Sequence, residues 1–131
     1  MSKNTFIIIK AIIPVDKVHI FVLQFCMTTK EIEFDQDKAK INFQVHKVRF
    51  ETASLVFADP LRIERRDDSE NNTTGEERWQ TLGMVEKVLF VVYTERGKKT
   101  RIISARIANK AEKRSYYGHD DNNRKGWSKA N

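Results

Sequence analysis

The sequence lacks the residues from which most metal and cofactor sites are built. It has one cysteine, Cys26, and three scattered histidines, His19, His46 and His119. It has no pair of cysteines or cluster of histidines, no glycine-rich phosphate loop and no G-x-S-x-G nucleophile elbow. The sequence therefore shows no motif for metal-dependent nucleotide hydrolysis or for a cofactor-dependent reaction. A single cysteine cannot form an internal disulfide, which fits a reducing cytosol.

Long apolar runs are missing as well. Residues 6–9, 11–15 and 18–25 are mainly apolar, but polar residues and Pro14 interrupt them, so no run of about 18 apolar residues exists. We therefore expect no membrane-spanning helix, and no small-residue cleavage site marks a secretory signal. Residues 1–26 are an extra strand, an unstructured extension, or a segment upstream of a true start at Met27, and we favour the last interpretation.

The positive charge is concentrated in the C-terminal part of the chain. The 131 residues suit one domain, which we place at residues 27–117, and the formal net charge is +6. From Arg96 to the end there are 11 Lys and Arg against 3 Asp and Glu, or +8, so residues 1–95 carry −2. A basic surface of this kind favours a phosphate-bearing partner.

Apolar periodicity and turn residues divide the domain into short elements. They are a strand at 31–35, helices at 37–46 and 50–58, strands at 77–83, 88–94 and 100–107, and a helix at 108–117. Residues 61–75 have no apolar period and predict a mobile loop. Residues 118–131 predict a disordered polar tail, in which Trp127 is unexplained. This order predicts an α+β fold, in which N-terminal helices and a C-terminal helix pack on one face of a small antiparallel sheet.

The first helix has two distinct stripes. Ile41 and Val45 lie four residues apart and are expected on its buried side. Lys38, Asn42 and His46 lie at the same interval and line another flank.

Two strands and a short turn containing Gly97 predict a β-hairpin at the centre of the domain. Arg101 and Arg106 lie on its second arm, an odd number of residues apart. A regular strand would direct them to opposite faces, unless a bulge intervenes. We favour Arg106 as the functional residue because the closing helix follows it directly.

Arginine, histidine, glutamate and tyrosine around a small sheet are enough to cleave RNA without a metal. The 2′-hydroxyl is the nucleophile, so the protein has to remove its proton, neutralise the scissile phosphate and protonate the leaving oxygen. Histidine or glutamate can transfer the protons, and guanidinium groups can stabilise the charge on the phosphorane.

Five ordered motifs connect these residues with a known family. They are F-D-x-x-K-A-x-x-N-x-x-x-H, F-E-x-A-x-x-V-F-A-D-P, G-E-E-R-W-x-x-L-G, V-V-Y-T-E-R-G and R-I-I-S-A-R-x-A-x-x-x-E-x-x-x-Y. From about Ile32 to Tyr117 the chain resembles the BrnT family, the toxin ribonucleases of bacterial type II toxin–antitoxin modules. The resemblance supports Met27 as the start.

The resemblance implies a RelE-like fold and metal-independent RNA cleavage that arrests translation in the bacterial cytoplasm, with no cofactor. It also implies neutralisation by a BrnA-type ribbon-helix-helix antitoxin, with operator DNA bound only through the toxin–antitoxin complex.

The same motifs imply the site residues. Catalytic roles are expected for His46, Arg78, Arg106 and Glu112. RNA-binding roles are expected for Arg96, Arg101, Lys113 and Tyr117. The family commonly has glycine after the histidine, where this chain has Lys47, so we expect an extended or strained helix end that shifts His46.

Each of these residues also has an ordinary structural interpretation. His46 can satisfy the carbonyls at a helix end, Glu112 can be a surface partner, and Tyr117 can be part of the core. The alternative function is a non-catalytic nucleic-acid-binding module or a toxin that has lost its activity. It predicts salt-dependent binding without cleavage.

Overall fold

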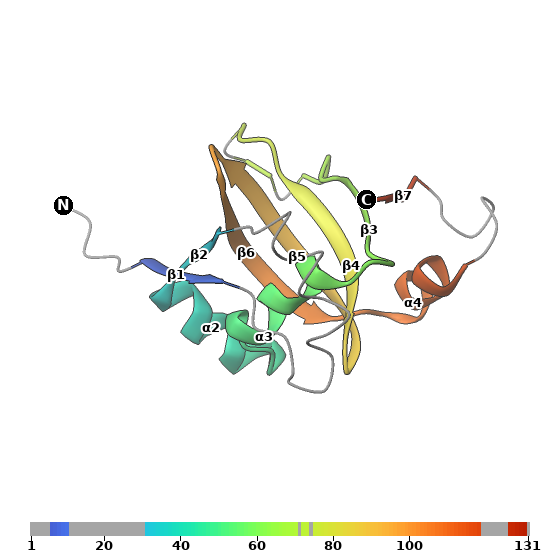
Figure 1. Ribbon diagram of the computed structural model, residues 1–131, viewed down its shortest axis with the longest axis horizontal. Coiled ribbons are helices and arrows are strands. Elements are labelled where there is room, and N and C mark those ends of the chain that lie inside the picture. The colour runs from blue at the N-terminus through green and yellow to red at the C-terminus, as the bar shows by residue number, and fades with distance from the viewer. Residues whose placement is uncertain (1–5, 11–30, 71, 74, 119–125, 131) are drawn as a thin grey trace.

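The computed structural model describes residues 6–10, 31–70, 72–73, 75–118 and 126–130. The elements in chain order are β1 (Phe6–Lys10), β2 (Glu31–Asp35), α2 (Gln36–His46), α3 (Phe50–Ser54), the 3-10 helix η2 (Leu55–Ala58), β3 (Ile63–Arg66), β4 (Trp79–Val85), β5 (Lys87–Arg96), β6 (Lys99–Ile107), α4 (Lys110–Tyr117) and β7 (Ser128–Lys129). The strands form one seven-stranded sheet in the order β1-β2-β6-β5-β4-β3-β7 (Figure 1).

The predicted α+β class is confirmed, but the sheet is mixed rather than purely antiparallel. β2 runs parallel to β6, with Glu31 opposite Lys99 and Glu33 opposite Arg101. The other strand pairs in the described part of the sheet are antiparallel. A parallel neighbour requires a long crossover between the two strands, and the helices and the central strands supply it here.

The central hairpin is confirmed and contains a β-bulge. Val92 of β5 lies opposite Ser104 of β6, and the next residue, Tyr93, lies opposite Ile102. Ile103 is therefore an extra residue on β6. A bulge of this kind bends the strand and changes which side chains share a face.

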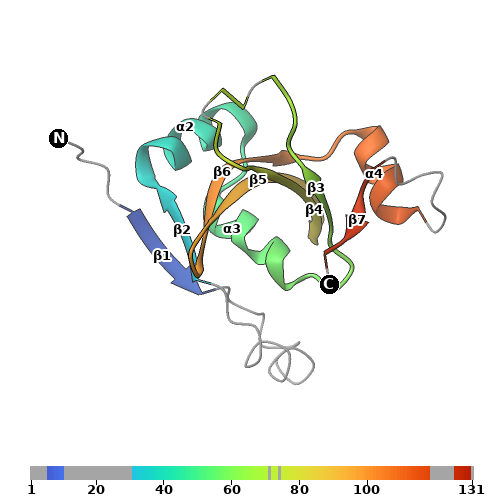
Figure 2. The same ribbon diagram turned by 90° about the horizontal axis from the view of Figure 1, so that it is seen from above.

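Alternate side chains of β5 enter two cores on opposite faces of the sheet. Leu89 and Val91 join the core that α3 and η2 cover, with Ile32, Phe34, Val48, Phe50, Ala53, Val56, Ile102 and Ala105. Val88 and Phe90 join the second core, with Ile63, Leu82, Ala108 and Trp127, and Tyr116 of α4 packs against it. The expectation that all helices pack on one face is therefore wrong. Seen from above, α4 and β7 lie together at the end of the sheet away from β1 (Figure 2).

The first helix is confirmed as α2, but its predicted buried stripe is wrong. Ile41 is 59% exposed and Val45 is 66% exposed, whereas the polar Asn42 is buried. Asp35 caps the helix by accepting hydrogen bonds from two backbone N–H groups at its start. Two hydrogen bonds between the Asn42 side chain and the backbone of Ala105 in β6 set the rotation of the helix, in place of Ile41 and Val45.

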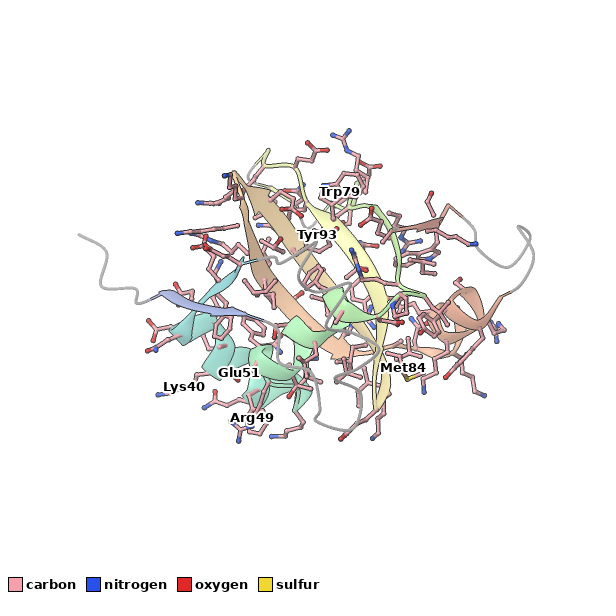
Figure 3. The ribbon with its side chains drawn as sticks, viewed as in Figure 1. Lys40, Arg49, Glu51, Trp79, Met84 and Tyr93 are labelled. Atoms are coloured by element: carbon pink, nitrogen blue, oxygen red, sulfur yellow. The ribbon has the colours of Figure 1, made fainter. Side chains whose placement is uncertain are left out.

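The second helix is confirmed, and it changes from α3 to the tighter η2 after Ser54. It approaches β4 closely at Gly83, where a Cβ atom would lie 2.7 Å from the Cβ of Val56. A glycine is therefore required for this contact. At the start of β4, Trp79 pairs with Tyr93 of β5, and the two residues lie close together in Figure 3.

The mobile loop predicted at residues 61–75 is wrong where β3 forms. Arg62 is only 4% exposed and donates hydrogen bonds of 3.2 Å to both Glu64 and Thr81. Ile63, between these charged residues, is buried against the opposite face. Because the buried side chains on one face of this strand are charged, the sequence lacks the apolar and polar alternation by which a strand is predicted.

The disordered tail predicted at residues 118–131 is also wrong for Gly126–Ala130. β7 pairs antiparallel with β3, and Trp127 is 6% exposed. Residues 119–125, and Met27 as the predicted start, lie outside the described residues. β1 in the N-terminal segment pairs with β2. In the described part of the chain, no helix has both the length and the apolar character to span a membrane.

Candidate functional site

Arg106 and Glu112 form a two-pronged ion pair between β6 and α4. Arg106 Nη1 donates to Glu112 Oε1 and Nη2 donates to Glu112 Oε2, each at 2.8 Å. The Arg106 side chain is 34% exposed and that of Glu112 only 10%. The Arg106 guanidinium also lies 4.0 Å from the ring centroid of Phe90. The carboxylate thus holds the end of the guanidinium and leaves the Nε edge for another partner.

The start of α4 explains why Glu112 lies there. Asn109 and Glu112 form a capping box, in which each side chain accepts a hydrogen bond of 2.8 Å from the backbone N–H of the other. Burial opposes ionisation of Glu112. Hydrogen bonds from Arg106 and the Asn109 N–H, with the charges of Arg106 and Arg65, nevertheless hold the Glu112 pKa below its usual range. Glu112 is therefore an ionised anchor for Arg106.

The bulge at Ile103 brings Arg101 onto the same face as Arg106. Arg101 lies opposite Thr94, and Arg106 lies opposite Phe90, four residues away on β5. Residues four apart on a strand share a face, so both arginines do as well. Arg101 is engaged with Glu33 of β2, at 3.3 Å between Nε and Oε1.

Arg65 on β3 belongs to this face too, and the sequence analysis missed it. Its Nε donates to Gln80 Oε1 at 2.7 Å, and its guanidinium lies 4.2 Å from the ring centroid of Trp127. The alternation of Ile63 and Arg65 was the available signal. It was lost when the segment was interpreted as a loop.

Arg78 lies one residue before β4 and extends the same face. Its carbonyl accepts a hydrogen bond of 2.8 Å from the Asp67 N–H, which continues the pairing of β3 with β4. Alternation from Gln80 therefore places Arg78 on the face of Arg65. The Arg78 Nε is buried and has no hydrogen-bond partner in the described part of the chain.

Arg78 and Arg106 line this face at separate points. Arg78 is level with Thr94, because Trp79 next to it pairs with Tyr93. Thr94 is four residues from the partner of Arg106, which corresponds to roughly 13 Å along β5. The two arginines also flank β5 on different strands. The arrangement therefore suits an extended chain of phosphates better than one phosphate held by both.

His46 lies apart from the arginines, at the exposed end of α2. It lines a surface groove of about 200 Å³ with Lys38, Ile41, Asn42, Val45 and Ile103. The expected flank of α2 thus exists, and the bulged residue of β6 forms the opposite wall. The lining residues of this groove include no arginine. The connection to Arg106 runs through Asn42, which is bonded to the neighbouring Ala105.

The helix end beside His46 shows how the chain does without the glycine common in the family. Lys47 adopts φ 60° and ψ 25°, and its N–H donates to the Phe43 carbonyl at 2.9 Å. The helix therefore ends at His46 without an extension, and the strain is carried by Lys47 in the left-handed region.

Of the other predicted RNA-binding residues, Arg96 shares the face of Thr94 at the far end of β5, and Lys113 and Tyr117 lie on α4. Arg96, at the tip of the hairpin, is ion-paired with Glu76 at 2.9 Å. Lys113 is exposed on α4. Tyr117 is 55% exposed and contacts the ring of Tyr116 edge to face. Among the residues predicted as catalytic, Arg106 and Glu112 are ion-paired with each other.

The described residues contain no group of three His, Cys, Asp or Glu side chains that could hold a metal ion. We call the sheet face that carries Arg65, Arg78, Arg101 and Arg106 the arginine face. Together with Glu112, the carboxylate that holds Arg106, it contains most of the candidate functional side chains.

Comparison with protein families settles the affiliation. Residues 34–112 match the family described as the ribonuclease toxin, BrnT, of type II toxin–antitoxin systems. The chain belongs to the BrnT family. The match runs from the last two residues of β2 to the first turn of α4, and so includes His46, Arg78, Arg106 and Glu112. A search of curated proteins found no match. BrnT membership implies a ribonuclease toxin of a type II system, with an RNA substrate and an antitoxin partner.

Proposed function

We propose that this BrnT protein is a metal-independent endoribonuclease that cuts RNA by attack of a 2′-hydroxyl and so inhibits translation. The observation that carries the proposal is the Arg106–Glu112 pair. It fixes a guanidinium on a sheet face that also holds Arg65, Arg78 and Arg101. Guanidinium groups recognise phosphate through paired hydrogen bonds, and a row of them suits a nucleic-acid backbone.

Arg106 is the phosphate-binding group of the proposed reaction. The 2′-oxygen attacks the adjacent phosphorus and the bond to the 5′-oxygen breaks, which yields a 2′,3′-cyclic phosphate and a 5′-hydroxyl. The Nε edge of Arg106 is free of described partners and is available to the phosphorane oxygens. A fixed donor at such a position stabilises the charge that develops in the transition state.

His46 is the proposed proton-transfer residue. An imidazole can remove the proton of the 2′-hydroxyl or deliver one to the 5′-oxygen near neutral pH. His46 lines the groove beside Ile103, and Asn42 of the same helix is hydrogen-bonded to Ala105, the residue before Arg106. Glu112 acts mainly by orienting Arg106, because an ionised carboxylate already bound to a guanidinium is a weak base.

The other RNA contacts and the partners are part of the same proposal. Arg96, Arg101, Lys113 and Tyr117 extend the contact with RNA beyond the scissile phosphate. A BrnA-type ribbon-helix-helix antitoxin neutralises the toxin, and operator DNA is bound only by the complex. The protein acts in the bacterial cytoplasm. The charge of +8 from Arg96 onward favours polyanionic or acidic partners.

The test combines growth and cleavage. Induced expression of the full chain is expected to stop growth, and the purified protein to cut RNA in the presence of EDTA. Arg106→Ala is expected to reduce cleavage about 100-fold or more, as for loss of a transition-state donor. Arg49→Ala is the matched control, because Arg49 lies at the start of α3 and points away from the sheet (Figure 3). Salt-dependent binding without cleavage would instead identify a non-catalytic module.

A further inference from the structure

The C-terminal segment returns to the arginine face. β7 adds to the edge of the sheet beside β3, and the Ala130 N–H donates to the Arg62 carbonyl at 3.0 Å. This segment lies beyond the residues that match the family. Its indole, that of Trp127, is buried although Ser128 and Lys129 next to it are exposed. The segment thus places one large aromatic group on the face that carries Arg65 and Arg106.

Trp127 and Phe90 lie in a row between two cations, Arg65 and Arg106. Arg65 lies 4.2 Å from the centroid of the indole. The indole meets the ring of Phe90 edge to face, with centroids 6.4 Å apart and an interplanar angle of 85°. Arg106 covers the same Phe90 ring at 4.0 Å. The order is therefore Arg65, Trp127, Phe90, Arg106.

A nucleotide of single-stranded RNA can make the same contacts, with its base in the place of the indole. Proteins bind unpaired bases by stacking them on aromatic rings and guanidinium planes, and they bind the adjoining phosphates with arginine. An indole has two fused rings, as a purine has, and its π-face attracts a cation in the same way. Arg65 is held ready for such a contact, because Gln80 binds its Nε and Asp67 in turn accepts from Gln80 at 2.9 Å.

We propose that Arg65 and Phe90 form a nucleobase-binding subsite for RNA next to the Arg106 phosphate site, and that Trp127 occupies this subsite when RNA is absent. The inference rests on the proposed function, since it assigns a substrate contact and a competing segment to the same face. RNA enters when its base replaces the indole between Arg65 and Phe90. The phosphate of the same nucleotide then reaches the Nε edge of Arg106.

The attachment of the segment is suited to exchange. β7 has two residues and pairs with β3 through two register positions. Gly126 has φ 87° and no neighbouring atom within 4 Å of a Cβ position, so glycine makes the left-handed turn into the segment without any side-chain contact. The buried contacts of the indole are regained by the incoming base. The free energy needed to replace Trp127 by a base is therefore mainly that of breaking the short pairing between β7 and β3.

Fluorescence of the full-length Trp79→Phe variant tests the exchange directly. The sequence has two tryptophans, so Trp127 is the sole indole in this variant. The probe is a 12-nucleotide oligoribonucleotide with 2′-O-methyl groups, which prevent cleavage. Saturation with this RNA is expected to shift the Trp127 emission to the red, as the indole moves from the core into water. An unchanged emission maximum at saturation would overturn the inference.

Affinity for the same RNA gives a second measurement. Trp127→Ala is expected to bind about tenfold more tightly, which corresponds to the low end of one stacked base. Adenosine monophosphate is expected to raise the melting temperature of Trp127→Ala and not that of the wild type. Ile63→Ala is the control, because Ile63 lies in the same core but is not one of the four residues of this row. Equal effects of Trp127→Ala and Ile63→Ala would show that Trp127 is only a core residue.

Ala130→Pro covers the case in which Trp127→Ala fails to fold. It removes the N–H that binds the Arg62 carbonyl and leaves the indole in the chain. It is expected to tighten RNA binding by a smaller factor, and unchanged or weaker binding would count against the inference. Cleavage of unmodified RNA by the wild type is measured in parallel. Wild-type cleavage without the fluorescence shift would refute the subsite alone, whereas a shift without cleavage would refute the ribonuclease proposal alone.

Discussion

Asn42 of α2 pairs with Ala105 of β6 as a neighbouring strand would. Its Nδ2 donates to the Ala105 carbonyl at 2.8 Å, and its Oδ1 accepts from the Ala105 N–H at 3.1 Å. Nδ2 also donates to the Val48 carbonyl at 3.0 Å. One buried side chain thus closes the free edge of β6 and sets both the rotation and the position of α2. The location of His46 relative to Arg106 depends on this contact.

Replacement of Asn42 by alanine is expected to lower the free energy of unfolding by about 2–4 kcal/mol, because buried backbone groups of Ala105 and Val48 lose their partners. Denaturant unfolding measures the change. Gln44→Ala, on the exposed side of α2, is the control and is expected to change the stability by less than about 0.5 kcal/mol. Similar losses in both variants would contradict the proposed role of Asn42.

The ion pair of Glu112 predicts a specific dependence of stability on pH. The folded-state pKa of Glu112 is lowered, so its stabilising contribution is complete above the unfolded value of about 4.3 and disappears as the pH falls through the folded value. At pH 7 the free energy of unfolding of the wild type is expected to exceed that of Glu112→Gln by about 2 kcal/mol, as for hydrogen bonds to a charged group. Unfolding measured from pH 7 to pH 3 should show this difference shrinking in acid. A difference that is constant over this range would exclude the ionised anchor.

Alanine substitutions at Gly83 and Gly97 distinguish the cost of steric crowding from the cost of backbone strain. Gly83→Ala places a Cβ 2.7 Å from the Cβ of Val56 and is expected to cost about 1–3 kcal/mol of stability. Gly97→Ala meets no atom within 4 Å, but φ is +62°, so a smaller cost of about 1 kcal/mol is expected from strain. Thermal unfolding of both variants compares the two costs. A larger loss for Gly97→Ala would show that η2 can move away from β4.

Lys47 offers a substitution that should stabilise the protein. Lys47→Gly removes the left-handed strain at the end of α2 and is expected to add about 1 kcal/mol to the free energy of unfolding. Lys40→Gly, in the interior of the same helix, is expected to cost about 1 kcal/mol. The opposite signs, measured by denaturant unfolding, distinguish the helix end from the helix interior. Cleavage by Lys47→Gly should equal that of the wild type if His46 is already correctly placed.

The local elements of this fold could be predicted from sequence, because their signals are local. The hairpin of β5 and β6 has apolar strands and a glycine turn, and α4 has a capping residue and Glu112 at the correct spacing. Arg106 and Glu112 were both expected as catalytic residues, but their ion pair was not predicted, because it joins β6 to α4 across the intervening turn. The family motifs added His46 and Arg78 without showing how far apart they lie.

The missed features depend on contacts between distant segments. The bulge at Ile103 is a property of two strands in register, so one strand could not reveal it. Asn42 outweighs Ile41 and Val45 because its partners belong to β6 and to the turn after α2. Arg65 was hidden by the inward-pointing charges around it. Trp127 was unexplained until β7 was seen beside β3.

The extra residue in β6 compensates for the odd spacing of Arg101 and Arg106. If β5 and β6 paired without the bulge and kept Ile103, Arg101 would lie opposite Glu95 and would turn to the side that carries Val91. Deletion of Ile103 would instead leave Arg101 opposite Thr94, because the two arginines would then be four residues apart. The alignment of two neighbouring strands, and not the arginines themselves, therefore decides whether the positive charge gathers on one side of the sheet.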